Sequence, residues 1–240
     1  MIAIIFALAL LLFGWERHRA GWVLPPIARW PWHLAAANAA QLALVLAGGL
    51  LWDRYFQRHC LWHLGSHLSP WAGGGLAYFI ATFVYYWWHR ARHAASWLWL
   101  GLHQLHHSPA RIEVLMAFYK HPAAQLANAL FSSLLVYAVL GLSPAGAATA
   151  ALLSASAEFF YHLNVRTPRW VGYFVQRPEM PRLHHACGAH HSNYGDLPLW
   201  DLLFGTYQNP VSYDGSCGFA GTPSWRAMLL FRDEQHRRES

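Results

Sequence analysis

The sequence predicts an all-α protein, an integral membrane bundle of four to five apolar helices with a cytoplasmic, histidine-rich helical cap that holds a di-metal site. Apolar residues make up 55% of the 240 residues. Charged residues make up only 12%, about half the share of a typical soluble domain. The apolar residues form long runs that suit membrane helices. Eleven histidines lie between His89 and His191, clustered at or beyond the ends of these runs.

Five apolar runs are expected to form the bundle. The first run is short, and because it has neither a basic leader nor a small-residue cleavage site we expect a retained anchor. Trp30 and Trp32 precede the second run, and the third ends in Tyr-Tyr-Trp-Trp, as is typical of a membrane interface. A tight turn at 143–146 separates the last two, and an amphipathic piece is expected near 200–204. The runs cover residues 2–15, 33–52, 71–88, 123–142 and 147–161.

The charge distribution predicts the orientation of the bundle. If the N-terminus faces out, only Arg54 and Arg58 of the 17 lysines and arginines lie outside, as the positive-inside rule requires. Every histidine cluster then lies on the cytoplasmic side. The net charge of +6 comes from scattered arginines rather than a basic stripe, which argues against nucleic-acid binding. The three cysteines contain no C-x-x-C pair, and no disulfide framework is expected.

The spacing of the histidines predicts converging metal ligands. His89 and His93 are four residues apart, and His103 is followed by His106 and His107 at the third and fourth positions. Residues three and four apart share one face of a helix. Neutral imidazole is the commonest side-chain ligand for transition metals, and two such clusters with a third at 184–185 exceed the needs of one ion. We therefore expect two ions between converging helices.

Glu158 lies four residues before His162, near the end of the last apolar run. An ionisable residue in such a run suggests a function. It could bind a metal ion, orient His162 as a supporting carboxylate, or form an interfacial ion pair with an arginine. These alternatives stay open at this point.

A series of short motifs follows the third apolar run. They read YWWHRARH at 86–93, HQLHHSP at 103–109, HP at 121–122, HLNVR at 162–166, RPE at 177–179, LHH at 183–185, NYGD at 193–196 and LWDLLFGT at 199–206. In this order the motifs resemble those of the fatty acid hydroxylase/sterol desaturase superfamily of membrane-bound histidine-box oxygenases. The similarity covers roughly residues 77–209, so we expect membrane helices over 1–76, a hydroxylase/desaturase-like domain over 77–209 and a cytoplasmic tail over 210–240.

The resemblance implies a histidine-bound di-iron centre, which zinc could occupy instead, and an O2-dependent hydroxylation or desaturation of a lipid C–H bond. Glu158 and Asn164 are the candidates for a catalytic role, and Asn164, Asn193 and Asp201 would support the ligands or the fold. The sequence has no fused cytochrome segment and no dinucleotide motif, so electrons would come from a small cytochrome or a ferredoxin with its reductase. The implied metal ligands are His89, His93, His103, His106, His107, His121, His162, His184, His185 and His190.

Two positions depart from the family pattern. The third histidine box begins with Pro181 where the family usually has a histidine, and proline has no side-chain donor. One ion would lose a ligand, which Glu179, His190, His191 or water could replace. The acidic residue that often stands seven positions before the first box is Thr82 here. A catalytically impaired member of the family is therefore an alternative.

Two further classes of membrane protein, a zinc-dependent hydrolase and a metal transporter, stay open. All-nitrogen ligation also suits zinc, as in a membrane hydrolase, but the sequence has no His-Glu-x-x-His motif. A metal transporter would need polar groups along the middle of its helices, and these runs are nearly bare of them apart from Glu158.

Overall fold

The computed structural model describes residues 2–188 and 191–235, and within these ranges it contains helices and no β-strand apart from one isolated bridge between Ala186 and Cys217. The all-α prediction is confirmed. The helices are α1 Ile2–His18, α2 Trp30–Leu51, α3 Asp53–Arg58, α4 Pro70–Ala94, α5 Ser96–Leu102, α6 Gln104–His107, α7 Pro122–Ser133, α8 Pro144–Tyr161, α9 Glu179–His184, α10 Pro198–Leu203 and α11 Trp225–Leu229. Shorter turns are η1 Leu64–Ser66, η2 Val114–Met116 and η4 Arg169–Tyr173, and the π-helix η3 Leu134–Val139 continues α7.

Three of the long helices begin with the same local chemistry. Ser69 accepts a hydrogen bond from the Ala72 amide before α4, and Ser143 accepts one from the Gly146 amide before α8. In each case a proline follows at the first helical position, where its missing N–H costs nothing. His121 accepts from the Ala123 amide in the same way, ahead of Pro122 and α7. The turn expected at 143–146 is therefore wrong, because Ser143 and Pro144 start a helix.

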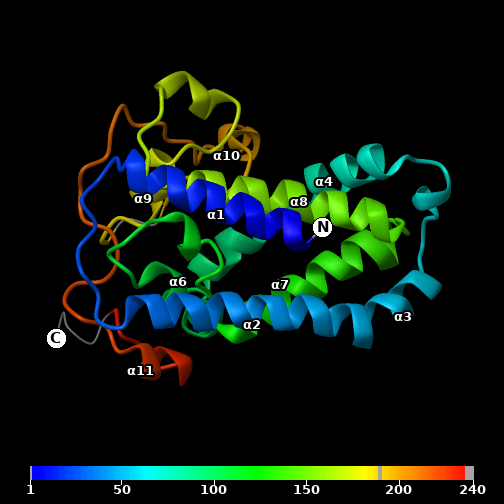
Figure 1. Ribbon diagram of the computed structural model, residues 1–240, viewed down its shortest axis with the longest axis horizontal. Helices are drawn as coiled ribbons and strands as arrows, with labels where there is room; N and C mark the ends of the chain where they lie inside the picture. The colour runs from blue at the N-terminus through cyan, green and yellow to red at the C-terminus, as the bar shows by residue number, and fades with distance from the viewer. Residues whose placement is uncertain (1, 189–190, 236–240) are drawn as a thin grey trace.

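The long helices form two layers beside a cavity. Figure 1 shows α1 lying along α8, with α4 beside them, and α2 running below with α7. Helices α4 and α8 approach closely at Gly74, where a β-carbon would lie 2.5 Å from Cβ of Thr149. The closeness of these two helices matters because α4 leads to His89 and His93, and α8 leads to His162.

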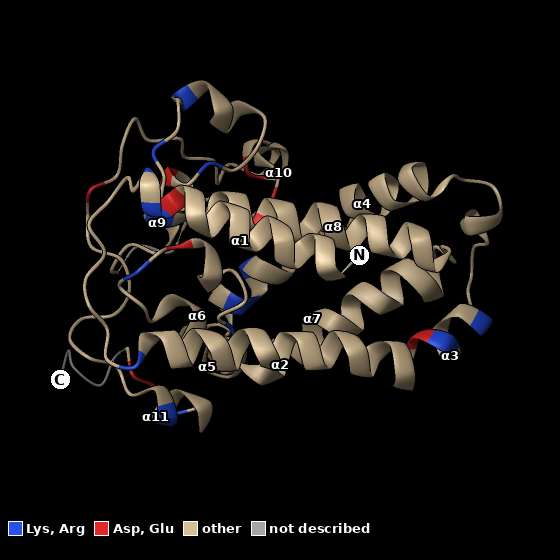
Figure 2. Ribbon diagram, viewed as in Figure 1, with Lys and Arg blue, Asp and Glu red and all other residues tan. Residues whose placement is uncertain are grey.

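Two helical segments are long and apolar enough to cross a membrane, namely α2 and the combined segment Pro122–Val139. Figure 2 shows that most of the charged residues gather at the end of the molecule that holds α6, α9 and α11, with a smaller set on α3 at the opposite end. The ribbon between these ends is almost free of charge. This distribution supports membrane association; the number of spans stays a prediction.

Candidate metal centre

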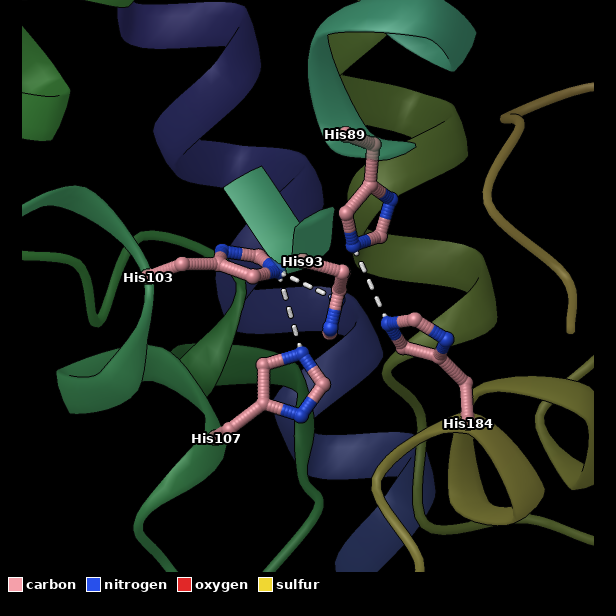
Figure 3. A group of neighbouring side chains, drawn as sticks. All are labelled: His89, His93, His103, His107 and His184. Carbon is pink, nitrogen blue, oxygen red and sulfur yellow. Dashed lines mark hydrogen bonds between the residues drawn. The ribbon is translucent and has the colours of Figure 1, made fainter. Parts of the chain in front are cut away.

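Five histidines from three parts of the chain form the first group of possible ligands. His89 and His93 lie on the last turns of α4, His103 and His107 flank and end the short helix α6, and His184 ends α9. One ligand atom from each lies within 4.8 Å of all the others. Figure 3 shows the rings pointing toward a common centre. We call these residues the five-histidine group: His89, His93, His103, His107 and His184.

The nitrogen–nitrogen distances in this group suit a shared cation. His103 Nε2 lies 2.9 Å from His93 Nε2 and 3.1 Å from His107 Nε2, and the Nε2 atoms of His89 and His184 are 3.0 Å apart. Two ligands held at right angles about 2.1 Å from one ion would lie about 3.0 Å apart. Unprotonated nitrogens facing each other at this distance repel unless a cation or a proton lies between them.

Three further histidines, His106, His162 and His185, form a second group with the same 4.8 Å limit, and all three are buried. We call them the three-histidine group. The ring of His185 stacks on the ring of His107 at 4.0 Å and an interplanar angle of 7°. The two groups are therefore neighbours, joined through a stacked pair.

Backbone carbonyls set the tautomer of four of these histidines. A carbonyl oxygen lies at hydrogen-bond distance from Nδ1 in each, so an N–H at Nδ1 can donate and leave Nε2 as the free base. Such a second hydrogen bond is a common feature of metal-binding histidines. The pairs are His89 with Tyr194 (2.8 Å), His106 with Tyr119 (3.2 Å), His162 with Glu158 (2.8 Å) and His184 with Ser192 (2.7 Å).

The residues fit a metal ion at both groups. His162 Nε2 is buried and has no hydrogen-bond partner among the described residues, while its Nδ1 is satisfied. A buried polar atom without a partner is costly, and an ion at the three-histidine group would satisfy it. Burial lowers the pKa of His103, His106 and His107 well below its usual value, and neighbouring histidines add to the effect; Arg92 contributes at His103 and His106. These rings are therefore neutral, as ligands must be.

The structure does not bring all predicted ligands together. His121 lies in neither group, because its Nδ1 caps α7 and its ring packs 4.8 Å from the ring of Phe231. In this structure His121 serves as a helix cap, and its role as a ligand stays a prediction. His190 lies outside the described residues. The other eight predicted histidines make up the two groups.

The two candidate catalytic residues have other partners. The Glu158 carboxylate pairs with Lys120 Nζ at 2.6 Å, rather than with an arginine or His162, and only its backbone carbonyl meets the His162 ring. Asn164 is bound to the backbone of Trp22 and to Arg182. Asn164 thus ties the segment after α1 to the segment after α8, and its catalytic role stays a prediction.

Pro181 stands where the resemblance implies a further histidine for the second group. Its carbonyl accepts from the His185 amide at 2.7 Å, so the two residues stand one helical turn apart at the end of α9, where a histidine side chain would share the face of His185. Glu179 does not replace the missing ligand, because it binds Thr167 and Arg177. Thr82 accepts a hydrogen bond from Trp200 Nε1 at 2.9 Å and so helps to dock α10 on α4.

Asp201 organises the loop behind the five-histidine group. Its carboxylate accepts from the amides of Tyr194 and Gly195 and from the Thr206 hydroxyl. Burial raises the pKa of Asp201 to about 6 despite these hydrogen bonds. The loop in turn supplies the Tyr194 carbonyl that orients His89. Asp201 thus supports a ligand indirectly.

A cavity of about 820 Å³ connects the histidines to the apolar helices. Its walls come from α1, α2, α4, α7 with η3, and α8, and it reaches both histidine groups. Three polar residues at this end were not singled out by the sequence reasoning: Arg92, Lys120 and Asp196. Arg92 follows His89 by three residues, so the helical period that found His93 could also have found Arg92.

Two neighbouring histidine groups, each able to hold a metal ion, lie beside a largely apolar cavity at the end of a helical, membrane-associated bundle, and together they define a class of metal-binding membrane protein. The profile of the fatty acid hydroxylase family matches residues 75–206, more than half of the chain. The chain therefore belongs to the fatty acid hydroxylase family, as its motifs predict.

Two relatives with assigned activities are similar to this chain. A sphingolipid C4-hydroxylase of Schizosaccharomyces pombe is 29% identical over 140 residues, which cover 57% of this chain and 48% of the relative. An alkylglycerol monooxygenase of Caenorhabditis elegans is 26% identical over 163 residues, or 66% of this chain and 30% of the relative. The matched regions span half or less of these relatives. No solved structure matches the chain.

Proposed function

We propose that this chain is a membrane-bound di-iron oxygenase that uses O2 to hydroxylate or desaturate a C–H bond of a lipid. The observation that carries the proposal is the pair of buried histidine groups opening on one apolar cavity. Family membership and the two lipid-hydroxylating relatives support the same chemistry.

In this proposal, different residues of the chain bind the metal ions, hold the substrate and orient the ligand rings. The five-histidine group and the three-histidine group would each hold one ion. Iron bound there would supply the activation of O2, which the protein cannot perform alone. The cavity, lined by α1, α2, α4, α7 and α8, would hold the alkyl chain and keep water away from the reacting carbon. Tyr194, Ser192, Tyr119 and Glu158 would fix the ligand rings through their carbonyls.

The remaining expectations concern partners and placement. We place the histidine end on the cytoplasmic side of a multi-pass protein, where the arginine-rich surface would receive a small cytochrome or a ferredoxin with its reductase. Complementary charge favours such docking. The lipid would enter sideways from the bilayer, since the cavity is lined by residues of the apolar helices α1 and α2.

One specific observation favours a second candidate, a catalytically impaired member of the family. The second group has only three histidines among the described residues, and the Glu179 carboxylate is paired with Arg177. If the second ion binds weakly, the protein would keep the fold and lose the reaction.

Lipid mass spectrometry of cells with and without the gene tests the proposal. We expect lipids that gain one oxygen, or lose two hydrogens, only when the gene is present and His106 is intact. The His106→Ala variant, expressed to the same level, serves as the control for effects of the protein itself. An unchanged lipid profile with iron-loaded protein would favour the impaired relative.

A further inference from the structure

The cavity changes character along its length. On α4 the residues that line it are Ala77, Ala81, Tyr85, His89 and Arg92. They are three or four positions apart, so a single face of the helix borders the cavity. With a rise of 1.5 Å per residue, Ala77 and Arg92 lie roughly 22 Å apart along the axis. Along α4, the part of the cavity wall far from the histidines is thus formed by alanines, and the part beside the histidines is polar.

Helix α8 repeats this gradient in the same direction. Its lining residues run from Ala147 and Ala151 through Ser154 to Glu158 and His162. Both helices therefore present small side chains at one end and charged side chains beside the histidines at the other. An alkyl chain alone would need no charged groups at the reacting end.

Arg92 is the least satisfied of these charged groups. The residue is 6% exposed, and its Nε and Nη1 atoms are buried without a hydrogen-bond partner among the described residues. It packs over the Trp88 ring at 5.8 Å. Burying a charged donor without an acceptor is costly, whereas a guanidinium offers five N–H groups. Arg92 therefore lacks an acceptor that an occupant of the cavity could supply.

The groups around Arg92 are already paired and of mixed sign. Lys120 is held by Glu158 at 2.6 Å, and the Tyr161 hydroxyl donates to Asp196 at 3.0 Å. Both carboxylates lie within electrostatic range of Arg92. An anionic occupant would meet these two carboxylates, while a neutral group with hydroxyl or amide oxygens would avoid that repulsion.

We propose that Arg92 binds an oxygen atom in the neutral, hydroxyl- or amide-bearing head of an amphiphile whose alkyl chain fills the apolar half of the cavity. The head then lies beside the two histidine groups, so the C–H bond attacked lies within a few carbons of it. The position of attack rests on the proposed function, whereas recognition of the head does not.

Competition binding to the full chain in detergent tests this proposal, in both the metal-free and the iron-loaded forms. A brominated alkane would quench the fluorescence of Trp30 and Trp52, which line the cavity. Three competitors with the same alkyl chain would displace it: 1-O-hexadecylglycerol, palmitate and hexadecane. The variants are Arg92→Met and Arg92→Lys. Arg90→Met is the matched control, because Arg90 lies on the same helix, donates to Tyr86 and does not line the cavity.

We expect hexadecylglycerol to bind the wild type more tightly than palmitate or hexadecane. Arg92→Met should lower the affinity for hexadecylglycerol about tenfold or more, as for loss of a charged hydrogen bond. The affinity for hexadecane should change by no more than about twofold. Arg92→Lys should keep part of the preference, and Arg90→Met all of it. The proposal is overturned if palmitate binds most tightly, if the wild type shows no preference for a head, or if Arg92→Met weakens hexadecane equally.

Iron content and product formation, measured on the same preparations, separate this proposal from the proposed function. If the protein prefers hexadecylglycerol through Arg92 but holds no iron, only the proposed oxygenase function is contradicted. A protein that oxidises lipids while Arg92→Met keeps full head preference contradicts only the assignment of Arg92.

Discussion

At the scale of single residues, a substitution of His106 tests the three-histidine group without removing a member of the five-histidine group. His106 is buried, it belongs to the three-histidine group, and its Nδ1 is held by the Tyr119 carbonyl. His106→Ala leaves that group two imidazoles, so we expect metal analysis to find about one ion fewer per chain and product formation to be abolished. His63→Ala is the control, since His63 is exposed and contacts Cys60. Equal damage from His63→Ala would contradict the assignment.

A histidine in place of Pro181 is expected to strengthen metal binding rather than weaken it. A histidine there would share the face of His185 and could give the three-histidine group a fourth ligand. We expect Pro181→His to raise the affinity for the second ion about tenfold, which corresponds to about 1.4 kcal/mol of binding free energy. Competition with a chelator measures this change, with Pro181→Ala as the control for loss of the proline alone. Equal metal retention in both variants would contradict a vacant ligand position.

The neutral histidines predict how stability depends on pH. Because burial lowers the pKa of His103, His106 and His107 in the folded protein, the unfolded chain binds more protons below the ordinary histidine pKa of about 6.5. Stability is therefore complete above pH 6.5 and falls as the pH drops, by up to about 1.4 kcal/mol per pH unit for each histidine. Denaturation of the metal-free protein from pH 7.5 to 5.5 measures the slope, which should be shallower in His106→Ala. Identical slopes would contradict buried neutral rings.

Individual residues also mark the limit of what the sequence could predict. Eight predicted histidines lie in the two groups, because helical spacing fixes their directions. His121 lies outside both groups for a local reason: a histidine before a proline can cap a helix, and no ligand motif distinguishes that use. Lys120 was not among the partners that the sequence suggested for Glu158, because it is far away in the sequence and only the fold brings it within 2.6 Å.

At the scale of helices, the contact between α4 and α8 controls the geometry of both groups. A β-carbon at Gly74 would lie 2.5 Å from Cβ of Thr149 and 2.7 Å from the Gly146 carbonyl oxygen. Gly74→Ala should therefore push the helices apart and cost about 1–3 kcal/mol, and it should lower metal content. Gly75→Ala is the matched control, because nothing lies within 4 Å of its β-carbon. Thermal unfolding in detergent compares the two, and equal midpoints would contradict the close approach.

The helices themselves were largely predictable. Each of the five apolar runs falls mainly in a helix or its continuation, because hydrophobic length is a local property of the sequence. The ends were less predictable: α1 continues to His18, where Glu16 is buried and accepts from the amides of Val114 and Asn164. That contact joins three distant segments and leaves no local pattern. The short helices α9 and α11 likewise depend on packing rather than on periodicity.

At the scale of the whole molecule, the native cysteines test the orientation in the membrane. Cys60 lies near α3 at one end of the molecule, and the exposed Cys187 follows α9 at the other. If the histidine end is cytoplasmic, a membrane-impermeant maleimide should label Cys60 in intact cells and Cys187 only after permeabilisation. The variants Cys187→Ser and Cys60→Ser each remove one of the two reactive thiols and so separate the two signals, because the remaining Cys217 is buried. The reverse labelling pattern would contradict the predicted orientation.

The central claim is that imidazoles from α4, the α5–α6 segment, α8 and α9 meet around two ions. The most direct measurement is the metal content of the full chain purified in detergent after iron loading, with the same preparation of His106→Ala beside it. We expect close to two irons per chain for the wild type and close to one for the variant. A wild-type chain that holds no metal, or a single zinc ion that His106→Ala does not disturb, would contradict it.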